Sequence, residues 1–261
     1  MDFAAAFGGA PDGDDAWAFE LPERFNGAFG GTNGGVLTAL SVFVARRATG
    51  RRPASIDSRY LRGFRPGRAR VVPRVVREGR TLSVLAVDVV DARDRVCTTS
   101  TVTLAAPEAL AADLDVSAHP ERPEMRDFSD GHPWPANPAQ PIPMLATFRP
   151  TSLGRTAHQV ATGIAVVWDE PGTSAEAACI AADVSVGPPV MRAVKGRASI
   201  PNPDLSLRFV REAPPAPHLA AVCALEGVDR GLATTRIEVW QDDVLLAIGI
   251  STTTCLPLRP S

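Results

Sequence analysis

One arrangement of secondary structure occurs twice in this chain, and it limits the fold more than any other feature of the sequence. In the first copy, apolar residues recur at helical spacing from Val36 to Ala48, and Thr49-Gly50 ends the segment with a C-terminal glycine. Four β-branched runs follow, separated by short turn sequences. These predicted strands are Ser55–Phe64, Arg70–Val76, Thr81–Val90 and Arg95–Ala105. One helix followed by four closely spaced strands predicts a largely antiparallel sheet with the helix on one face.

The second copy repeats this order. An extended region, Gln159–Trp168, leads into a helix-compatible segment, Ser174–Val184. The strand-like runs after it are Arg197–Val210, His218–Glu226, Ala233–Trp240 and Val244–Cys255. Pro53-Ala54-Ser55-Ile56 in the first copy resembles Arg197-Ala198-Ser199-Ile200 in the second. Since the offset stays at roughly 150 residues, the pattern indicates duplication of a whole helix-and-sheet unit rather than a solenoid of short repeats.

A proline-rich segment separates the two copies. It includes His132-Pro133-Trp134-Pro135, which is too dense in proline for regular structure. The predicted organisation is an N-terminal unit, 1–106, a Pro-rich linker, 107–146, and a C-terminal unit, 147–261. Within the linker, Trp134 and Met144 indicate that part of it packs back on the body of the protein.

Three motifs of the first half have the order and spacing of a known family. They are Phe29-Gly30-Gly31-Thr32-Asn33-Gly34-Gly35, Tyr60-Leu61-Arg62-Gly63-Phe64-Arg65-Pro66-Gly67 and Arg77-Glu78-Gly79-Arg80. Together with the duplication, they resemble the double-hotdog family of acyl-CoA thioesterase II over nearly the whole chain except the linker. The resemblance implies an α+β tandem double hotdog, in which each half is a long helix wrapped by an antiparallel sheet. The two sheets are expected to join side by side, because their edge strands need covering.

The resemblance also implies a set of catalytic residues. The family carries an aspartate near the end of the second-half helix, and Asp183 occupies that position. A Thr or Ser of the family falls at about Asn202, and a Gln on the last strand falls near Ser251, where this chain has no Gln. Asp183 would orient and partly deprotonate a water, with Asn202 and Ser251 as partners. An Asp late in a helix opposes the helix dipole, which favours a functional role, although an exposed or capping Asp is the alternative.

Two further groups of residues are candidates for substrate binding. Gly34 and Gly35 begin the first helix, where unpaired backbone N–H groups could stabilise the oxygen that becomes negative during thioester hydrolysis. Alternatively, they only permit a tight turn into the helix. Arg62 and Arg65 belong to a basic cluster that could bind the phosphates of coenzyme A. The alternative for these arginines is a solvated strand face.

Charge and composition argue against several other classes of protein. The 27 basic and 29 acidic residues give a net charge of −2, which supplies no broad field for nucleic acid or an anionic membrane. The longest apolar runs fall short of the roughly 20 residues that span a bilayer. The N-terminal residues lack the pattern of a secretory signal, so a cytoplasmic protein is expected. The cysteines and histidines lie far apart and the glycines lack a P-loop lysine, so no metal and no cofactor is expected.

Two functions of different classes remain. The first is an acyl-CoA thioesterase that hydrolyses its substrate with an Asp-oriented water, as Asp183 and the glycine loop favour. The second is a non-hydrolytic hotdog protein that binds an acyl thioester or a polyketide-like ligand, as the absence of the family Gln favours. In both, the expected partner is an acyl-CoA or an acyl-carrier-bound thioester, and assembly into a homo-oligomer is compatible with the sequence.

Overall fold

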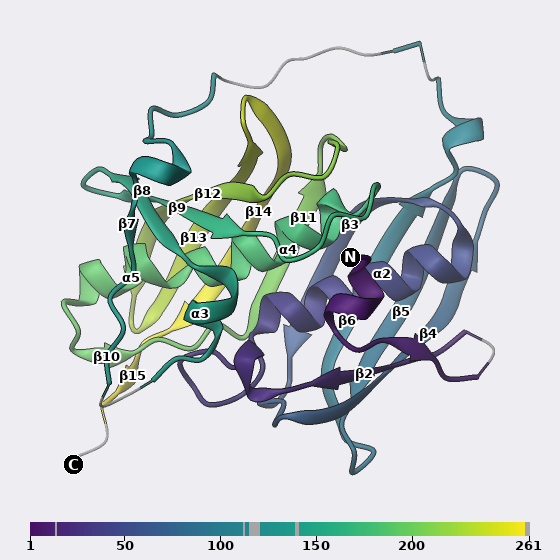
Figure 1. The fold of residues 1–261 in the computed structure, drawn as a ribbon, viewed down its shortest axis with the longest axis horizontal. Coiled ribbons are helices and arrows are strands. Elements are labelled where there is room, and N and C mark those ends of the chain that lie inside the picture. Colours follow the sequence, from purple (N-terminus) through teal and green to yellow (C-terminus); the bar gives the residue numbers. More distant parts are fainter. Residues whose placement is uncertain (14, 112, 115–120, 139–140, 259–261) are drawn as a thin grey trace.

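Both copies of the predicted unit are present in the computed structural model, which describes residues 1–13, 15–111, 113–114, 121–138 and 141–258 (Figure 1). The elements of the first part are α1 (Phe3–Ala6), β1 (Ala10–Pro11), β2 (Trp17–Leu21), η1 (Glu23–Phe25), α2 (Gly34–Thr49), β3 (Arg52–Tyr60), β4 (Gly67–Glu78), β5 (Leu82–Val90) and β6 (Val96–Ala105). The intervening elements are η2 (Pro107–Ala109), η3 (Phe128–Asp130), β7 (His132–Pro133) and α3 (Met144–Phe148). The remaining elements are β8 (Thr151–Arg155), β9 (Gln159–Ala165), α4 (Ser174–Ser185), α5 (Gly187–Val194), β10 (Ala198–Ser199), β11 (Asp204–Phe209), β12 (His218–Asp229), β13 (Leu232–Gln241), β14 (Val244–Thr254) and β15 (Leu256–Pro257).

The described strands form one 13-stranded antiparallel sheet and a separate β10–β15 pair. Within the large sheet, the first half has the order β2-β4-β5-β6-β3 and the second half has the mirrored order β11-β14-β13-β12-β9. Each position of the first series therefore has a counterpart in the second. The halves meet where β3 pairs with β11 in antiparallel register, with Ile56 opposite Leu207. The predicted double hotdog, with its sheets joined side by side, is confirmed.

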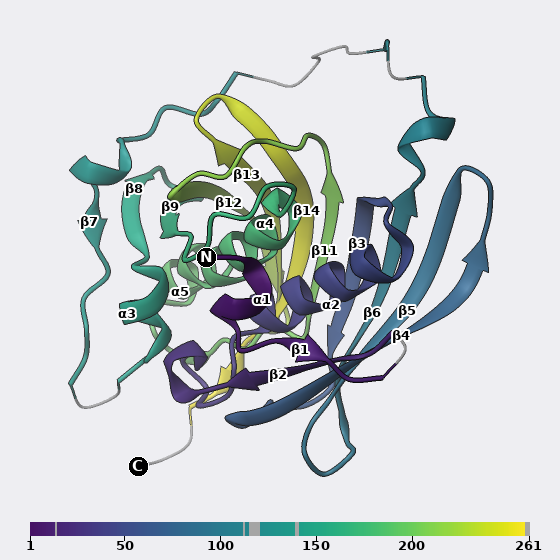
Figure 2. The same cartoon turned by 45° about the vertical axis from the view of Figure 1, so that its right-hand side comes forward.

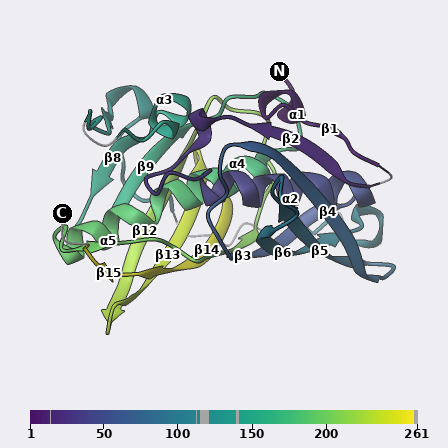
Figure 3. The same cartoon turned by 90° about the horizontal axis from the view of Figure 1, so that it is seen from below.

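The two long helices lie on the same side of the joined sheet and pack against each other (Figure 3). They run in opposite directions, because Gly35 at the start of α2 contacts Asp183 late in α4, while Arg46 near the end of α2 pairs with Glu176 at the start of α4. Both helices are largely buried, which explains why their apolar residues are not confined to a single stripe. The helix pair is thus the centre of the protein.

Local sequence determines where α2 begins and ends. The side-chain oxygen of Asn33 accepts a hydrogen bond from the Val36 N–H at 3.3 Å, so Asn33 is the N-cap. Gly50 ends the helix in the left-handed conformation, with φ of 66°, which glycine adopts without strain. The predicted helix Val36–Ala48 is confirmed within these limits.

One predicted strand of the second half is wrong in its extent. The segment Arg197–Val210 was expected to be a single strand, but it contains only β10 and β11, and the unpredicted helix α5 precedes it. Pro201 and Pro203 lie between the two strands, and a proline lacks the N–H that a sheet ladder requires. The interruption leaves Asn202 outside the sheet.

The helical stretch Ser174–Val194, which joins α4 and α5, is long and apolar enough to cross a membrane by length and composition, although the sequence had indicated no such segment. In the structure it lies within the protein, where 67% of it is buried. Burial against α2 and the sheet therefore accounts for its apolar composition.

Segments outside the two sheets pack back on the core. In the segment expected to be a linker, Trp134 is half-buried against the main core and Met144 is 7% exposed. At the N-terminus, α1 lies beside α2 (Figure 2), where Phe3 stacks on Phe43 and meets Trp168 edge-on. The Phe3 N–H also donates to the Glu170 carboxylate at 2.9 Å. These contacts tie the N-terminal residues to the second half.

We expect the replacement Gly35→Ala to destabilise the protein. The added Cβ would lie 2.7 Å from the Asp183 Cβ and 2.8 Å from the Ile180 Cα, so α2 and α4 would have to separate. Overpacking of this kind costs about 1–3 kcal/mol, which urea unfolding would measure. Gly227→Ala is the matched control, because no atom lies within 4 Å of the added Cβ there. Equal stability of the two variants would contradict the inferred packing of the helices.

Candidate active site

The most distinctive polar group of the core is the Asp183 carboxylate, which is 6% exposed and lies at the junction of the two halves. Its Oδ2 accepts a hydrogen bond from Asn33 Nδ2 at 2.7 Å. Its Oδ1 accepts one from Asn202 Nδ2 at 2.7 Å and one from the Tyr60 hydroxyl at 3.1 Å. The backbone N–H of Gly35 also favours the charged form of this carboxyl. Two of the three side-chain donors come from the first half and one from the second, so the site is assembled across the duplication.

The N-terminus of α2 supplies two of the donors. Asn33 uses both ends of its amide, since its oxygen caps the helix and its nitrogen donates to Asp183. The Gly35 N–H belongs to the first turn, where backbone donors have no partner within the helix. The positive end of the α2 dipole therefore faces Asp183, and this offsets the unfavourable position of Asp183 near the C-terminal end of its own helix.

The other two donors come from the place where the sheets join. The Tyr60 N–H donates to the Pro203 carbonyl at 2.8 Å, directly beside Asn202. The Tyr60 ring lies against Gly34, where an added Cβ would be 2.5 Å from the ring Cζ. The pairing of β3 with β11 thus places Tyr60 and Asn202 on the same carboxylate oxygen.

The protonation of Asp183 is governed by two opposing effects. Burial is the larger effect and raises the pKa of the carboxyl above its usual value, while the bonds from Asn202, Gly35, Tyr60 and Asn33 lower it. All four neighbours are donors, which is the arrangement that an ionised carboxylate requires. Asp183 is therefore placed as a buried acceptor of hydrogen bonds.

The structure does not connect Ser251, the third expected catalytic residue, with this cluster. Ser251 is 1% exposed on β14, and its hydroxyl donates to the Asp204 carbonyl at 2.7 Å. Thr252 donates its N–H to the Asp204 side chain at 2.7 Å. Among the residues that the structure describes, Ser251 has no hydrogen bond with Asp183. Its observed contacts hold β14 to the start of β11.

Packing against neighbouring residues explains why positions 34 and 35 are glycines. The sequence had instead suggested that glycine lets a thioester approach the backbone there. The Cβ positions of Gly34 and Gly35 are filled by Tyr60 and by α4, respectively, so both glycines are needed for packing. The Gly35 N–H is directed to Asp183. Over the described part of the chain, the Gly34 N–H has no hydrogen-bond partner, so it is the donor of this pair that remains available to a ligand.

Arg62 and Arg65 lie in the segment that follows β3, and both are exposed. This segment is held against the glycine loop, because the Thr32 N–H donates to the Phe64 carbonyl at 2.8 Å. The arginines are therefore near the loop that leads into α2. Within the described ranges, neither side chain forms an ion pair with a carboxylate.

Sequence reasoning did not assign a role to Asn33 or Tyr60. Both occur in the motifs of the first half, but their side chains reach Asp183 only through tertiary structure. A sequence signal exists for Asn33, since Asn is a favoured N-cap before a helix. For Tyr60 the signal is weaker: it is the only tyrosine of the chain, and it stands at the end of a strand beside a glycine-rich turn.

A second buried carboxylate lies at the other end of the helix pair. Glu176 is 0% exposed and accepts a hydrogen bond from Arg46 Nε at 3.0 Å. Its Oε2 and the Arg46 Nη2 are buried without a partner among the described residues. Burial is the main effect and raises the pKa of Glu176 to about 7, while the charge of Arg46 opposes the shift. The pair is thus incompletely compensated.

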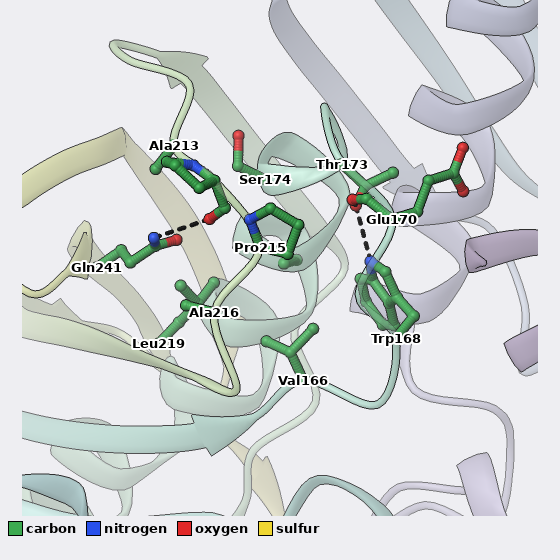
Figure 4. A pocket seen from close by; sticks show the side chains of 12 residues that line it. Val166, Trp168, Glu170, Thr173, Ser174, Ala213, Pro215, Ala216, Leu219 and Gln241 are labelled. Atoms are coloured by element: carbon green, nitrogen blue, oxygen red, sulfur yellow. Dashed lines mark hydrogen bonds between the residues drawn. The ribbon is translucent and has the colours of Figure 1, made fainter. Parts of the chain in front are cut away.

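Figure 4 shows a shallow cleft at the N-terminal end of α4, between Trp168, Leu219 and the segment around Pro215. Two hydrogen bonds lie within its lining, since Trp168 Nε1 donates to Thr173 and Gln241 Nε2 donates to the Pro214 carbonyl, both at 2.9 Å. Asp183 lies nine residues along α4 from Ser174, a distance of about 13 Å along the helix axis. The cleft is therefore separate from the Asp183 cluster.

Fold and site together define a double-hotdog protein in which a buried carboxylate at the junction of the halves accepts hydrogen bonds from both. A family model, the acyl-CoA thioesterase N-terminal domain, matches residues 21–105. No curated protein matches the sequence. The match supports the resemblance to the acyl-CoA thioesterase II-like family in the first half of the chain, and the likeness to solved structures over nearly the whole chain confirms the double-hotdog fold.

Three solved structures illustrate this likeness. A candidate thioesterase from Novosphingobium aromaticivorans has a TM-score of 0.80 at 20% identity, over 95% of this chain and 98% of its own. A protein of unknown function with a hot dog fold from Alicyclobacillus acidocaldarius has a TM-score of 0.77 at 17% identity, over 97% and 96%. The acyl-CoA thioesterase II TesB2 from Mycobacterium marinum has a TM-score of 0.74 at 14% identity, over 96% of each chain.

The raised pKa of Glu176 predicts a specific pH dependence of stability. Between the unfolded value of 4.5 and the folded value of about 7, the folded state binds more protons, so stability from this residue falls as pH rises. We therefore expect the stability of the parent relative to Glu176→Gln to be lower at about pH 8 than at about pH 5 in urea unfolding.

The exposed pair Glu226–Arg236 provides the control, because Glu226→Gln removes the same charge in contact with water. A parent protein that gains stability over Glu176→Gln as the pH rises would show that the attraction of Arg46 outweighs burial.

Proposed function

We propose that this protein hydrolyses an acyl-CoA thioester at the Asp183 cluster. The observation that carries the proposal is a buried aspartate placed between the halves of a double hotdog, beside the first turn of α2. The match of residues 21–105 to the acyl-CoA thioesterase N-terminal domain supports the reaction class. So does the shared fold with a protein described as an acyl-CoA thioesterase II.

The proposed reaction uses Asp183 as the base. Its carboxylate accepts a proton from a water, and the water oxygen attacks the thioester carbonyl carbon. The carbonyl oxygen then becomes negative and needs donors, for which the unpartnered Gly34 N–H at the start of α2 is the candidate. Collapse of the intermediate breaks the C–S bond, and the proton held by Asp183 passes to the thiolate that leaves. Asn202 holds the carboxylate in place, and no role in this reaction is assigned to Ser251.

The proposed substrate carries coenzyme A rather than a plain thiol. Arg62 and Arg65 are exposed beside the glycine loop and lack ion-pair partners in the described ranges, so they are available to phosphate groups. Arginine suits this task because its planar guanidinium binds phosphate oxygens in pairs.

One observation favours a second function, the binding of an acyl thioester without hydrolysis. Asp183 receives hydrogen bonds from three side chains, two of them on Oδ1, and a carboxylate oxygen whose acceptor sites are both occupied cannot also orient a water. Under this alternative the carboxylate stabilises the junction of the two halves, and the ligand lies beside it intact.

Asp183→Asn tests the proposed base. The amide cannot accept the proton, so kcat for the best acyl-CoA in a chain-length series should fall by roughly 100-fold or more. The NH2 group of the new amide would face the NH2 group of Asn33 or Asn202, and two donors cannot bond each other. Because this lowers stability, the fold of the variant should be checked by urea unfolding beside the assay.

Asp204→Asn is the matched control. Asp204 lies two residues from Asn202, and its oxygen accepts the Thr252 N–H, which an Asn oxygen can also do. Unchanged kcat is expected for this variant. A folded Asp183→Asn variant with the parental rate would remove Asp183 from the mechanism, and a binding protein would show no turnover in any variant.

The paired replacement of Arg62 and Arg65 by Gln tests the coenzyme A contact. We expect KM for an acyl-CoA to rise by roughly five- to thirty-fold at low salt, because each of the two exposed charge contacts is worth about 0.5–1 kcal/mol. KM for the corresponding acyl-pantetheine, which lacks the nucleotide phosphates, should not change. Arg77→Gln, at the far end of β4, is the control. An equal rise for both substrates would place the arginines elsewhere in the reaction.

A further inference from the structure

The donors around Asp183 pose a specific problem for catalysis. The Oδ1 atom of Asp183 already accepts two hydrogen bonds, from Asn202 and from Tyr60, and these fill the acceptor sites of one carboxylate oxygen. A water that attacks a thioester must donate to the carboxylate. One of these two donors therefore has to leave before Oδ1 can accept a proton from a water.

Two of the three side-chain donors to Asp183 are held in place by other bonds. Asn33 also caps α2, so its amide cannot turn without opening the first turn of the helix. Asn202 stands between two prolines whose carbonyls are both occupied, by the Thr254 N–H at 2.9 Å and by the Tyr60 N–H at 2.8 Å. The backbone on both sides of Asn202 is thereby fixed.

Tyr60 differs from the other donors in two respects. Its bond to Asp183, at 3.1 Å, is longer than the two side-chain bonds of 2.7 Å from Asn33 and Asn202. Its hydroxyl also lies 2.9 Å from the Thr38 hydroxyl, and either oxygen can be the donor. Tyr60 consequently has a second acceptor within reach, on α2.

We propose that Tyr60 is a positioning residue that turns its O–H from Asp183 to Thr38, and so frees the Oδ1 of Asp183 for the attacking water. This inference rests on the proposed function. With no water bound, Thr38 donates to Tyr60, and Tyr60 donates to Asp183. With water bound, Tyr60 donates to Thr38, and the ring moves away from Oδ1 by the small amount that a water contact requires.

The exchange leaves every hydroxyl with an acceptor. Thr38 is 0% exposed, so its own O–H needs a new partner when Tyr60 donates to it. A threonine in a helix can donate to the carbonyl four residues earlier, which is that of Gly34 here. Ser41 and Thr49 of the same helix donate in this way to Leu37 and Ala45, each at 3.0 Å. No proton is transferred between oxygens, since only the hydrogen-bond directions reverse.

The surroundings keep Tyr60 a donor in both arrangements. Burial, followed by the charge of Asp183, holds the pKa of Tyr60 well above its usual value. The phenol is therefore protonated at the pH of any assay. Because its ring is packed on Gly34, the hydroxyl can exchange partners while the ring stays between α2 and the end of β3.

A double-mutant cycle tests this exchange. Thr38→Val removes the second acceptor and confines Tyr60 to Asp183, so kcat for the best acyl-CoA should fall by about five-fold or more. Tyr60→Phe removes the competing donor, so kcat measured above the acid limb of the pH profile should rise. In the Tyr60→Phe background, Thr38→Val should change kcat by less than about two-fold. The Tyr60 hydroxyl, through which Thr38 acts, is absent from that variant. Thr49→Val, a helix hydroxyl away from the site, is the control.

The pH profile provides a readout that a purely structural role would not alter. Loss of the Tyr60 bond removes a donor from the charged form of Asp183, so the acid limb of kcat/KM should move to higher pH in Tyr60→Phe. Thr38→Val should leave that limb at or below its parental position. The exchange would be overturned if the effects of Thr38→Val and Tyr60→Phe on kcat simply multiply in the double variant and the acid limb of Tyr60→Phe stays at its parental pH.

A spectroscopic experiment separates this inference from the proposed function. Tyr60 is the only tyrosine, so tyrosine labelled at its phenol carbon gives one carbon signal in nuclear magnetic resonance. A non-hydrolysable acyl-CoA analogue should shift that signal in the parent and shift it much less in Thr38→Val. Loss of turnover in Asp183→Asn with no shift in the parent would retain the proposed function and reject the exchange. A shift without turnover in any variant would retain the exchange as a binding response and reject hydrolysis.

Discussion

The structure depends on the burial of one carboxylate between two halves of a duplicated chain. An ionised carboxylate in a protein interior is unfavourable by several kcal/mol unless hydrogen-bond donors surround it. For Asp183 the donors come from α2, from the end of β3 and from the segment before β11. The two halves must therefore meet in one register, because any displacement would leave the charge without partners. The same arrangement that stabilises the junction also creates a candidate base beside the first turn of a helix.

The packing of α2 against α4 determines the contrast between the two ends of this junction. Glu176 and Asp183 are seven residues apart, which places them two turns apart on the same face of α4. At one end, Asp183 accepts hydrogen bonds from three side chains. At the other end, Glu176 has one ion pair, and α1 covers the neighbouring surface with Phe3 against Phe43. The duplicated halves thus build two different environments from one symmetrical arrangement of helices, and only one of them is lined by donors from both halves.

The resting hydrogen bonds of Asp183 are compatible with catalysis only if they can be exchanged. A polar network in which each donor has one acceptor is rigid, while a network with an alternative acceptor has two arrangements of similar energy. Tyr60 and Thr38 supply that alternative, because a hydroxyl can both donate and accept. Under the proposed exchange, the distinction between a thioesterase and a protein that only binds thioesters concerns two hydroxyl groups rather than the fold, which both functions share.

The sequence by itself determined the duplication, the antiparallel sheets and the long helices, and it singled out Asp183 as a candidate site residue. These features follow from local patterns, namely helical and strand periodicity, turn residues, and a charge at a position that helix propensity does not favour. Tertiary structure alone decided which groups meet that charge. Asn33 and Tyr60 lie 150 and 123 residues from Asp183 along the chain, and no local pattern encodes a contact of that separation. The same is true of Ser251, whose hydroxyl the pairing of β11 with β14 directs to Asp204. Side-chain partners across such separations are set by how strands and helices pack, because packing fixes the directions in which side chains point.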